Sequence, residues 1–185
     1  MVHGSAVGAL AVMGEAAAPV LLNIVASEEH TDSAKGLATW GLSFVGTAGA
    51  PHLYKAVNSE KEAVRSAVIG ALTALVQEND EQQALELIVG GLSDSSAMVR
   101  SEAAAALGKL SNPDVIPHLG TVLGDADTDV RKTAAMAMMK IGSGDAIAPL
   151  QTALEQETDD AIQPVLRLAI AQLQKKQEEE NDGWD

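Results

Sequence analysis

The sequence predicts an all-α fold, a right-handed α-solenoid (superhelix) of about five stacked helix pairs with a truncated first pair. The first observation is a direct repeat, because residues 99–129 are followed by a near copy of themselves at 130–160. In each copy one apolar helix pattern stops at small and turn residues and a second pattern begins. The second observation is composition, 46% hydrophobic but only 2% aromatic. Small side chains let short helices approach closely, which suits such a stack.

The repeat extends toward both ends of the chain. The Val-Arg pair of Val99-Arg100 and Val130-Arg131 recurs at Val64-Arg65, and Lys35 holds the equivalent place one unit earlier. The unit that begins at Val64 is longer than its neighbours, and we expect its extra residues in a loop at 77–82, where an insertion costs least. The second helix of each pair, here the B helix, is expected at 16–27, 48–58, 82–93, 114–124 and 145–156.

Both ends of the repeat array are atypical. The first unit lacks most of its first helix, and residues 1–4 cannot supply it, so the chain begins either with a half-repeat cap or at the edge of a longer protein. We treat residues 1–175 as a single solenoid domain. Residues 176–185 are acidic and without periodicity, which predicts a disordered tail.

Charge and cysteine content exclude several classes of function. The net charge of −14 argues against binding to nucleic acid or to anionic membranes, because both require Lys and Arg. There is no cysteine, so thiol chemistry and Cys-ligated metals are excluded, and a cytoplasmic location is expected. The recurring Arg column is expected to pair with acids of neighbouring turns, which would set the angle between repeats.

One sequence pattern points to a known family. The chain shows D-x-x-V-R, then a small-residue helix that ends in A-L-G-K-L, a turn, and I-P-x-L-x-x-x-L. This pattern, clearest in 95–123 and 127–141, resembles the HEAT-like repeats first grouped with phycobilin lyase subunits, and it covers about residues 5–173. The resemblance implies a HEAT-like solenoid in a family of bilin lyases, chromophore-handling proteins, adaptors and a dinuclear iron hydroxylase. That hydroxylase uses His-Glu pairs, whereas no histidine here is followed by Glu: His3, His30, His52 and His118.

By analogy with similar solenoids, a partner protein is expected on the concave surface that the B helices line. His52 and His118 hold the same repeat position two units apart, about 20 Å at 8–10 Å between helices, which is too far for one metal ion. We therefore expect no metal and no cofactor. The candidate partner-binding residues on the B helices are His52, Lys55, Glu86, Leu87, His118, Thr121 and Thr152.

The few aromatic residues are candidates for anchors. Trp40 and Phe44 lie four apart on one helix, either packed against a neighbouring helix or exposed to a partner. Trp184 lies in the acidic tail, as a docking residue or as an inert end.

No catalytic motif is present, since G-x-S-x-G, P-loop and Rossmann glycine patterns are all missing. We therefore predict a non-enzymatic adaptor or scaffold for another protein. One alternative is a phycobilin lyase-type subunit or chaperone that acts on a bilin or a phycobiliprotein. Another is an adaptor for an iron–sulfur cluster carrier. A homodimer through the truncated N-terminal repeat is a further possibility.

Overall fold

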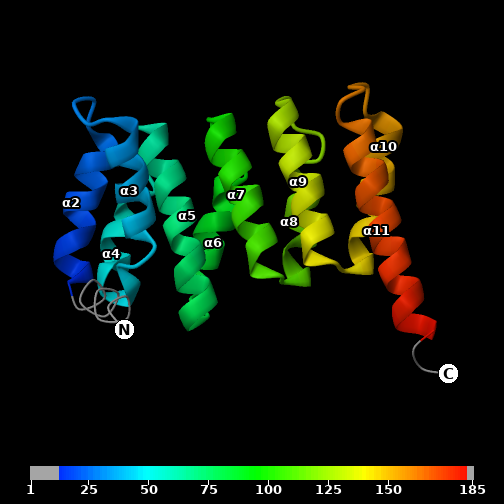
Figure 1. Ribbon diagram of the computed structural model, residues 1–185, viewed down its shortest axis with the longest axis horizontal. Coiled ribbons are helices and arrows are strands. Elements are labelled where there is room, and N and C mark those ends of the chain that lie inside the picture. The colour runs from blue at the N-terminus through cyan, green and yellow to red at the C-terminus, as the bar shows by residue number, and fades with distance from the viewer. Residues whose placement is uncertain (1–12, 183–185) are drawn as a thin grey trace. The chain divides into compact units, whose positions relative to one another are not determined.

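The structure is a computed structural model that describes residues 13–182, and every regular element in that range is a helix (Figure 1). The predicted all-α fold of stacked helix pairs is confirmed. The chain divides into two compact units, Met1–Gly91 and Leu92–Asp185, which are described in turn. None of the described helices combines the length and the apolar character that crossing a bilayer requires.

In the part of the chain that the structure describes, the first unit consists of helices that pack on one another around an apolar core. In it α2 packs on α3 and α4, and α5 packs on α3, α4 and α6. Ala18, Leu42, Leu53, Leu72 and Ile88 are fully buried and form its core. The helices of this unit are α2 (Gly14–Ala26), α3 (Asp32–Leu42), α4 (Gly46–Ala56), α5 (Glu62–Asn79) and α6 (Gln82–Gly91).

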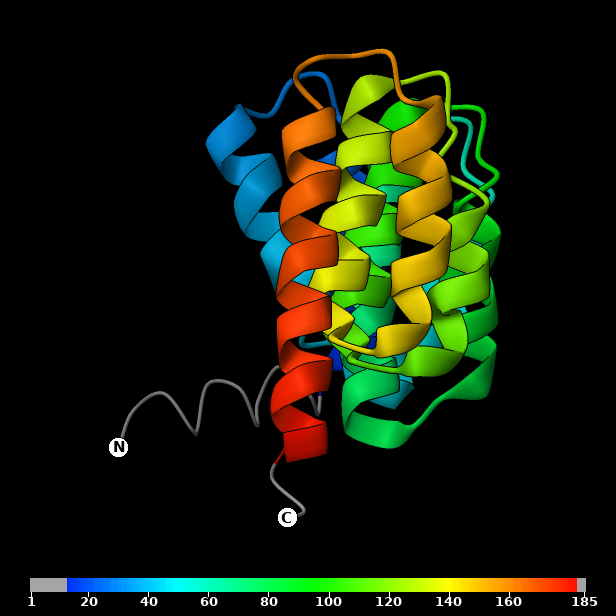
Figure 2. The same cartoon turned by 90° about the vertical axis from the view of Figure 1, so that its right-hand side faces the viewer.

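The second unit repeats a helix, a short 3₁₀ turn and a second helix. Figure 2 shows α11 and α10 side by side, and α9 contacts α7, α8 and α11. Leu107, Leu119, Met138, Leu150 and Leu166 form the core. The elements of this unit are α7 (Ala97–Leu110), η1 (Pro113–Val115), α8 (Ile116–Gly120), α9 (Thr128–Ile141), η2 (Gly144–Ala146), α10 (Ile147–Gln156) and α11 (Gln163–Asp182).

The predicted B helices are confirmed in place, because α2, α4, α6, α8 with η1, and α10 with η2 fall on the expected ranges within a few residues. Their apolar positions face the core as expected at Ala18, Val25, Leu53, Ile88 and Leu119. The period of the apolar pattern therefore identifies both the helices and their buried faces.

The extra residues of the third unit do not form a longer loop, so this prediction is wrong. Helix α5 continues through Gln77 to Asn79, and α6 starts at Gln82. No glycine or proline lies between Gly70 and Asp80, and the backbone of Asp80 turns left-handed at φ 52° and ends the helix. The insertion therefore lengthens a helix.

The C-terminal segment also differs from the expectation of a disordered tail. Helix α11 runs to Asp182, so residues 176–182 are helical. Nζ of Lys175 lies 3.6 Å from Oε1 of Glu179, and Nζ of Lys176 lies 3.8 Å from Oε1 of Glu180. Ion pairs at this spacing of four residues stabilise a helix. The Lys176 ammonium also donates to the carbonyl of Gly142, at 2.9 Å. Trp184 lies outside the described residues.

Candidate functional site

Two helices of the second unit, α7 and α9, each carry an arginine near their start that joins the helix to the loop ahead of the next helix pair. Arg100 on α7 donates through Nε and Nη2 to the Asp125 carboxylate, at 2.7 and 2.8 Å. Arg131 on α9 donates in the same way to Glu157, at 2.7 and 3.1 Å. Each guanidinium also donates to a backbone carbonyl of its own preceding loop, Asp94 at 2.9 Å and Asp125 at 3.0 Å. The predicted pairing of the Arg column with acids of neighbouring turns is confirmed at Arg100 and Arg131.

These pairs fix the charge of the acids they contain. The hydrogen bond from Arg100 lowers the pKa of Asp125, and the hydrogen bond from Arg131 lowers the pKa of Glu157. Both carboxylates also accept a backbone N–H two residues further along, from Asp127 and Asp159. Such carboxylates are held ionised and are positioned by several donors, so their role is structural.

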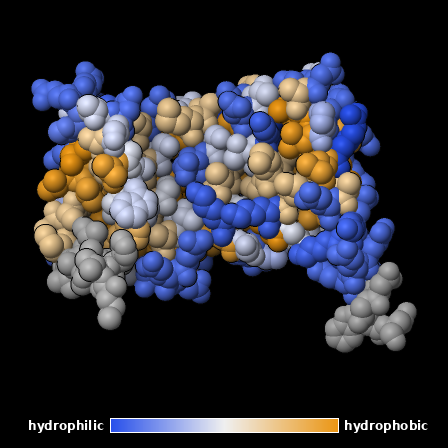
Figure 3. Space-filling view, in the orientation of Figure 1, coloured by the Kyte–Doolittle hydropathy of each residue, from blue (hydrophilic) through white to orange (hydrophobic). Residues whose placement is uncertain are grey.

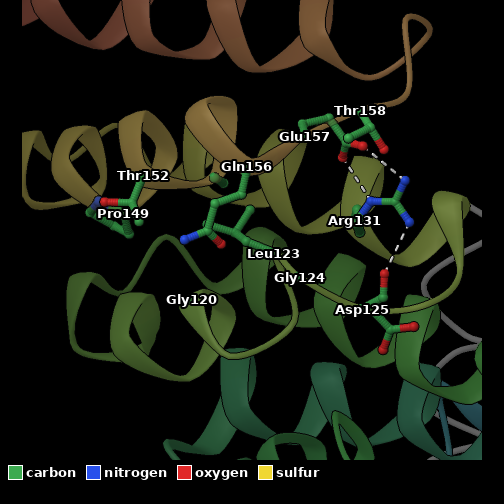
Figure 4. Close-up of a pocket in the computed structure, with 11 residues that line it drawn as sticks. Gly120, Leu123, Gly124, Asp125, Arg131, Pro149, Thr152, Gln156, Glu157 and Thr158 are labelled. Carbon is green, nitrogen blue, oxygen red and sulfur yellow. Dashed lines mark hydrogen bonds and ion pairs between the residues drawn. The ribbon is translucent and has the colours of Figure 1, made fainter.

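A cavity of about 490 Å³ lies between the second helices of these two pairs (Figure 4). Gly120 and Gly124 leave room on the α8 side, and Thr152 and Gln156 line the α10 side. The Arg131 and Glu157 pair closes one end. The charged groups at that end bind one another.

A second cavity, of about 710 Å³, continues from the first, because Gly120 and Pro149 line both. Its other walls come from Pro113, Ile116, Pro117 and Thr121, and its charged residues are Asp114 and Asp145. We call the two cavities together the α8–α10 groove. It is an open, partly apolar groove, and its free charges are negative.

The structure distributes the predicted B-helix residues over both units. Thr121 and Thr152 line the α8–α10 groove, and His118 is exposed on α8. In the first unit, Lys55 on α4 and Glu86 on α6 are exposed, whereas His52 and Leu87 are half-buried. Thr121 and Thr152 therefore lie in the same groove, whereas His118 and the four predicted residues of the first unit do not line it.

The aromatic pair forms the core of an exposed apolar patch in the first unit. The rings of Trp40 and Phe44 meet edge to face, with centroids 4.6 Å apart. Trp40 is 62% exposed and Leu37, one turn earlier, is 66% exposed; Val20 on the neighbouring α2 is 58% exposed. Figure 3 shows hydrophobic residues gathered over α2 and α3. We call Val20, Leu37, Trp40 and Phe44 the aromatic patch.

Sequence reasoning missed the residues that open the groove. The signal was present, because Gly120, Gly124, Pro117 and Pro149 are small or rigid residues on consecutive B helices. Nothing in the linear sequence shows that these residues of two successive repeats line the same groove. Within residues 13–182, no group of three or more His, Asp or Glu side chains could hold a metal ion.

The repeated helix pairs place this protein in the class of α-solenoids, which are built from helical repeats. A family model described as HEAT repeats matches residues 50–130 and 85–171. The chain therefore belongs to the HEAT-repeat family, and the resemblance to the phycobilin lyase type of HEAT-like repeat is confirmed.

One curated relative and several solved structures resemble the chain. The bilin biosynthesis protein MpeU of Synechococcus sp. (strain WH8020) is 34% identical over 162 residues, which is 87% of this chain and 54% of MpeU. This chain thus spans about half the length of that relative. The complex of CpcE and CpcF of phycocyanin lyase from Nostoc sp. PCC7120 gives a TM-score of 0.68 at 22% identity, over 83% of this chain and 98% of the matched chain. Kap121p gives a TM-score of 0.66 at 18% identity, over 86% of this chain and 21% of Kap121p.

These comparisons correct one prediction. The expectation of a non-enzymatic chain is wrong, because the curated relative MpeU is a bilin biosynthesis protein and the matched CpcE–CpcF complex is a phycocyanin lyase. The expectation rested on the lack of known catalytic sequence motifs, whereas the likeness to a bilin biosynthesis protein is seen only when the chain is compared with relatives.

Proposed function

We propose that this chain is a bilin lyase-type HEAT-repeat protein, which acts with a protein partner on a bilin and a phycobiliprotein. The observation that carries the proposal is the 34% identity to the bilin biosynthesis protein MpeU over 87% of this chain. The fold shared with a CpcE–CpcF complex supports a second protein subunit as the partner. The chain spans about half of MpeU, so its whole activity belongs to the proposal.

The charges of the α8–α10 groove suggest that this groove binds a protein and not a bilin. A bilin carries propionate groups, which need Arg or Lys. Among the described lining residues, Arg131 is the one cation, and its guanidinium is occupied by Glu157. We therefore assign this groove to protein recognition. Lys55, exposed on α4, is a cation that could face a propionate outside the groove.

The protein-binding surfaces in this proposal are the two that the structure exposes most clearly. The aromatic patch offers Trp40, the residue type that most often dominates interface energies. Within each unit, the B-helix side chains supply a mixed polar surface, which suits a protein better than a small ligand. The proposed contact residues are His52, Lys55, Glu86, Leu87, His118, Thr121, Thr152, Trp40 and Phe44, with Trp184 as a further candidate outside the described residues.

The test is co-expression of the full chain with a phycobiliprotein subunit, a bilin-producing pathway and each candidate HEAT-repeat partner. Bilin attachment is read by fluorescence of the phycobiliprotein band after denaturing electrophoresis, and complexes are read by size-exclusion chromatography. The proposal predicts attachment, or a bilin-bearing complex, only when this chain is present. Equal attachment without it, together with no complex in any combination, would overturn the proposal.

A variant pair tests the aromatic patch within the same assay. Trp40→Ser removes the exposed ring, whereas Met136→Ser removes an exposed apolar side chain (46% exposed) at the equivalent repeat position on α9. We expect Trp40→Ser to reduce complex formation about tenfold or more and Met136→Ser to leave it within about twofold. Loss of self-association instead would identify a second copy of this chain as the partner of the patch.

A further inference from the structure

Two carboxylates mark the free rim of the α8–α10 groove. Asp114 in η1 and Asp145 in η2 hold the same position in consecutive repeats, and both side chains are exposed. Asp145 accepts a hydrogen bond from the Ser143 hydroxyl at 3.0 Å. Within residues 13–182, neither carboxylate forms an ion pair with Lys or Arg. The rim therefore presents two unneutralised negative charges.

The walls of the groove offer apolar surface and few backbone donors. Pro113, Pro117 and Pro149 present ring methylenes and carry no N–H. Gly120, which lines both cavities, adds no side chain, so the floor stays open. A ligand in this groove is held by apolar contact and by charge at the rim.

The remaining charges of the groove do not change its sign. Arg131 is paired with Glu157, and the Asp125 carboxylate, only 10% exposed, is paired with Arg100. The Asp159 carboxylate also lies near this pair, with its Oδ2 3.9 Å from Nη2 of Arg131, and it adds another negative group at that end of the groove. An anionic ligand would meet uncompensated carboxylates, whereas a cationic ligand would be attracted along the groove.

From this geometry we infer that the α8–α10 groove binds a basic, extended segment of the partner protein. Neighbouring helices lie about 8–10 Å apart, which separates equivalent acids by about the same distance. An extended segment of polyproline-II type rises about 3.1 Å per residue with three residues per turn, so Lys or Arg at every third position would lie on one face and match successive repeats. An apolar residue between the two cations would fill the space beside the prolines. This inference specifies the partner in the proposed function. It rests on that function only where it assigns the basic segment to a protein of the bilin lyase system.

The test uses fluorescence anisotropy with the full chain and a fluorescein-labelled peptide in which Lys recurs at every third position with leucine between. The matched probe replaces each Lys with Glu. We expect saturable binding of the Lys peptide, weakened by added salt, and no binding of the Glu peptide. Equal binding of both peptides, or binding of neither, would overturn the inference.

Two double variants separate the groove from net charge. Asp114→Asn with Asp145→Asn removes the rim charges, and Asp129→Asn with Asp160→Asn removes two exposed acids of the same unit that do not line the groove. We expect about tenfold weaker binding in the first variant and a change within about twofold in the second. Equal weakening in both would show attraction to net charge alone and contradict the inference.

A third variant tests the groove without changing charge. Thr121→Trp places a large ring in the cavity from an exposed position, and circular dichroism checks that the helices persist. We expect it to abolish peptide binding. If free biliverdin bound the wild-type chain and Thr121→Trp abolished that binding, the groove would be a bilin site and the inference would fail. The peptide assay contains no bilin, so its result is independent of whether attachment occurs in the co-expression test.

Discussion

Arg131 and Glu157 form a two-point ion pair that joins the first turn of α9 to the loop before α11. The distances are 2.7 Å from Nε to Oε2 and 3.1 Å from Nη2 to Oε1, and the Glu157 side chain is only 5% exposed. Arg100 and Asp125 form the same link one repeat earlier. Because both hydrogen bonds must align, the link restricts how neighbouring helix pairs are oriented within this unit.

Replacing Arg131 with methionine should destabilise the chain strongly. The change removes the guanidinium from the buried carboxylate of Glu157, which keeps the backbone N–H of Asp159, and removes a donor from the carbonyl of Asp125. We expect the free energy of unfolding to fall by about 2–4 kcal/mol, measured by urea denaturation. Arg167→Met is the control, since Arg167 is exposed and donates to Gln163, and it should cost less than about 0.5 kcal/mol. Equal losses would contradict the structural role of the pair.

The same pairs predict acid sensitivity. The pKa values of Asp125 and Glu157 are lowered by their arginines, so both groups stabilise the folded state above their unfolded pKa values of about 3.9 and 4.3. That stabilisation is lost as pH falls below about 4 toward the lowered values. The urea midpoint should therefore drop between pH 5 and pH 3, and drop less in Asp125→Asn with Glu157→Gln. A pH dependence identical to that of the wild-type chain would contradict this.

Glu102 on α7 has a raised pKa, so its ionisation should change the stability of the fold in the opposite direction to that of Asp125 and Glu157. Burial raises its pKa, and the nearby Lys109 only partly opposes this, so its charged form disfavours folding at neutral pH. Glu102→Gln should raise the urea midpoint at pH 7, with a difference that shrinks toward pH 4. A lower midpoint at pH 7 would show that the Lys109 contact, at 3.9 Å, outweighs the burial.

Gly108 should not tolerate a side chain. A methyl group there would lie 2.8 Å from Cα and Cβ of Ala137, where α7 and α9 meet. Gly108→Ala should cost about 1–3 kcal/mol, because backbone must move to admit it. Gly90→Ala on α6 meets nothing within 4 Å, and it should be neutral or stabilise by up to about 1 kcal/mol. Thermal melts of the two variants compare the effects, and a stabilised Gly108→Ala would show that the helices can separate.

Deleting residues 178–185 tests the C-terminal segment. The deletion removes Glu179 and Glu180, which pair only with exposed lysines, so the free energy of unfolding should change by less than about 1 kcal/mol. If Trp184 is an anchor, partner affinity should fall equally in the deletion and in Trp184→Ala of the full chain. A loss in the deletion alone would assign the effect to the end of α11, and unchanged affinity in both would make the segment irrelevant to binding.

Much of the fold follows from local pattern. The apolar period places α2, α4, α6 and α10, and the repeated Val-Arg pair predicts the link from Arg131 to an acid of the next turn. The four extra residues around Gln77 were misplaced because propensity alone does not say where a helix ends. That end depends on the left-handed turn at Asp80. The expectation of a non-enzymatic chain was wrong for a different reason, since the likeness to the bilin biosynthesis protein MpeU is seen in a comparison with relatives and not in a motif.

The helix pairs, their buried faces and the residues that join them follow from the amino-acid sequence, because they depend on neighbours one helical turn or one repeat away. The packing of the helices is what shows that Gly120 and Pro149 line a shared groove, that Arg131 pairs with Glu157 at its end, and that Trp40 lies exposed. The reason is geometric. Groove width, pairing and exposure depend on how residues of different helices meet in space, and no linear spacing encodes that distance.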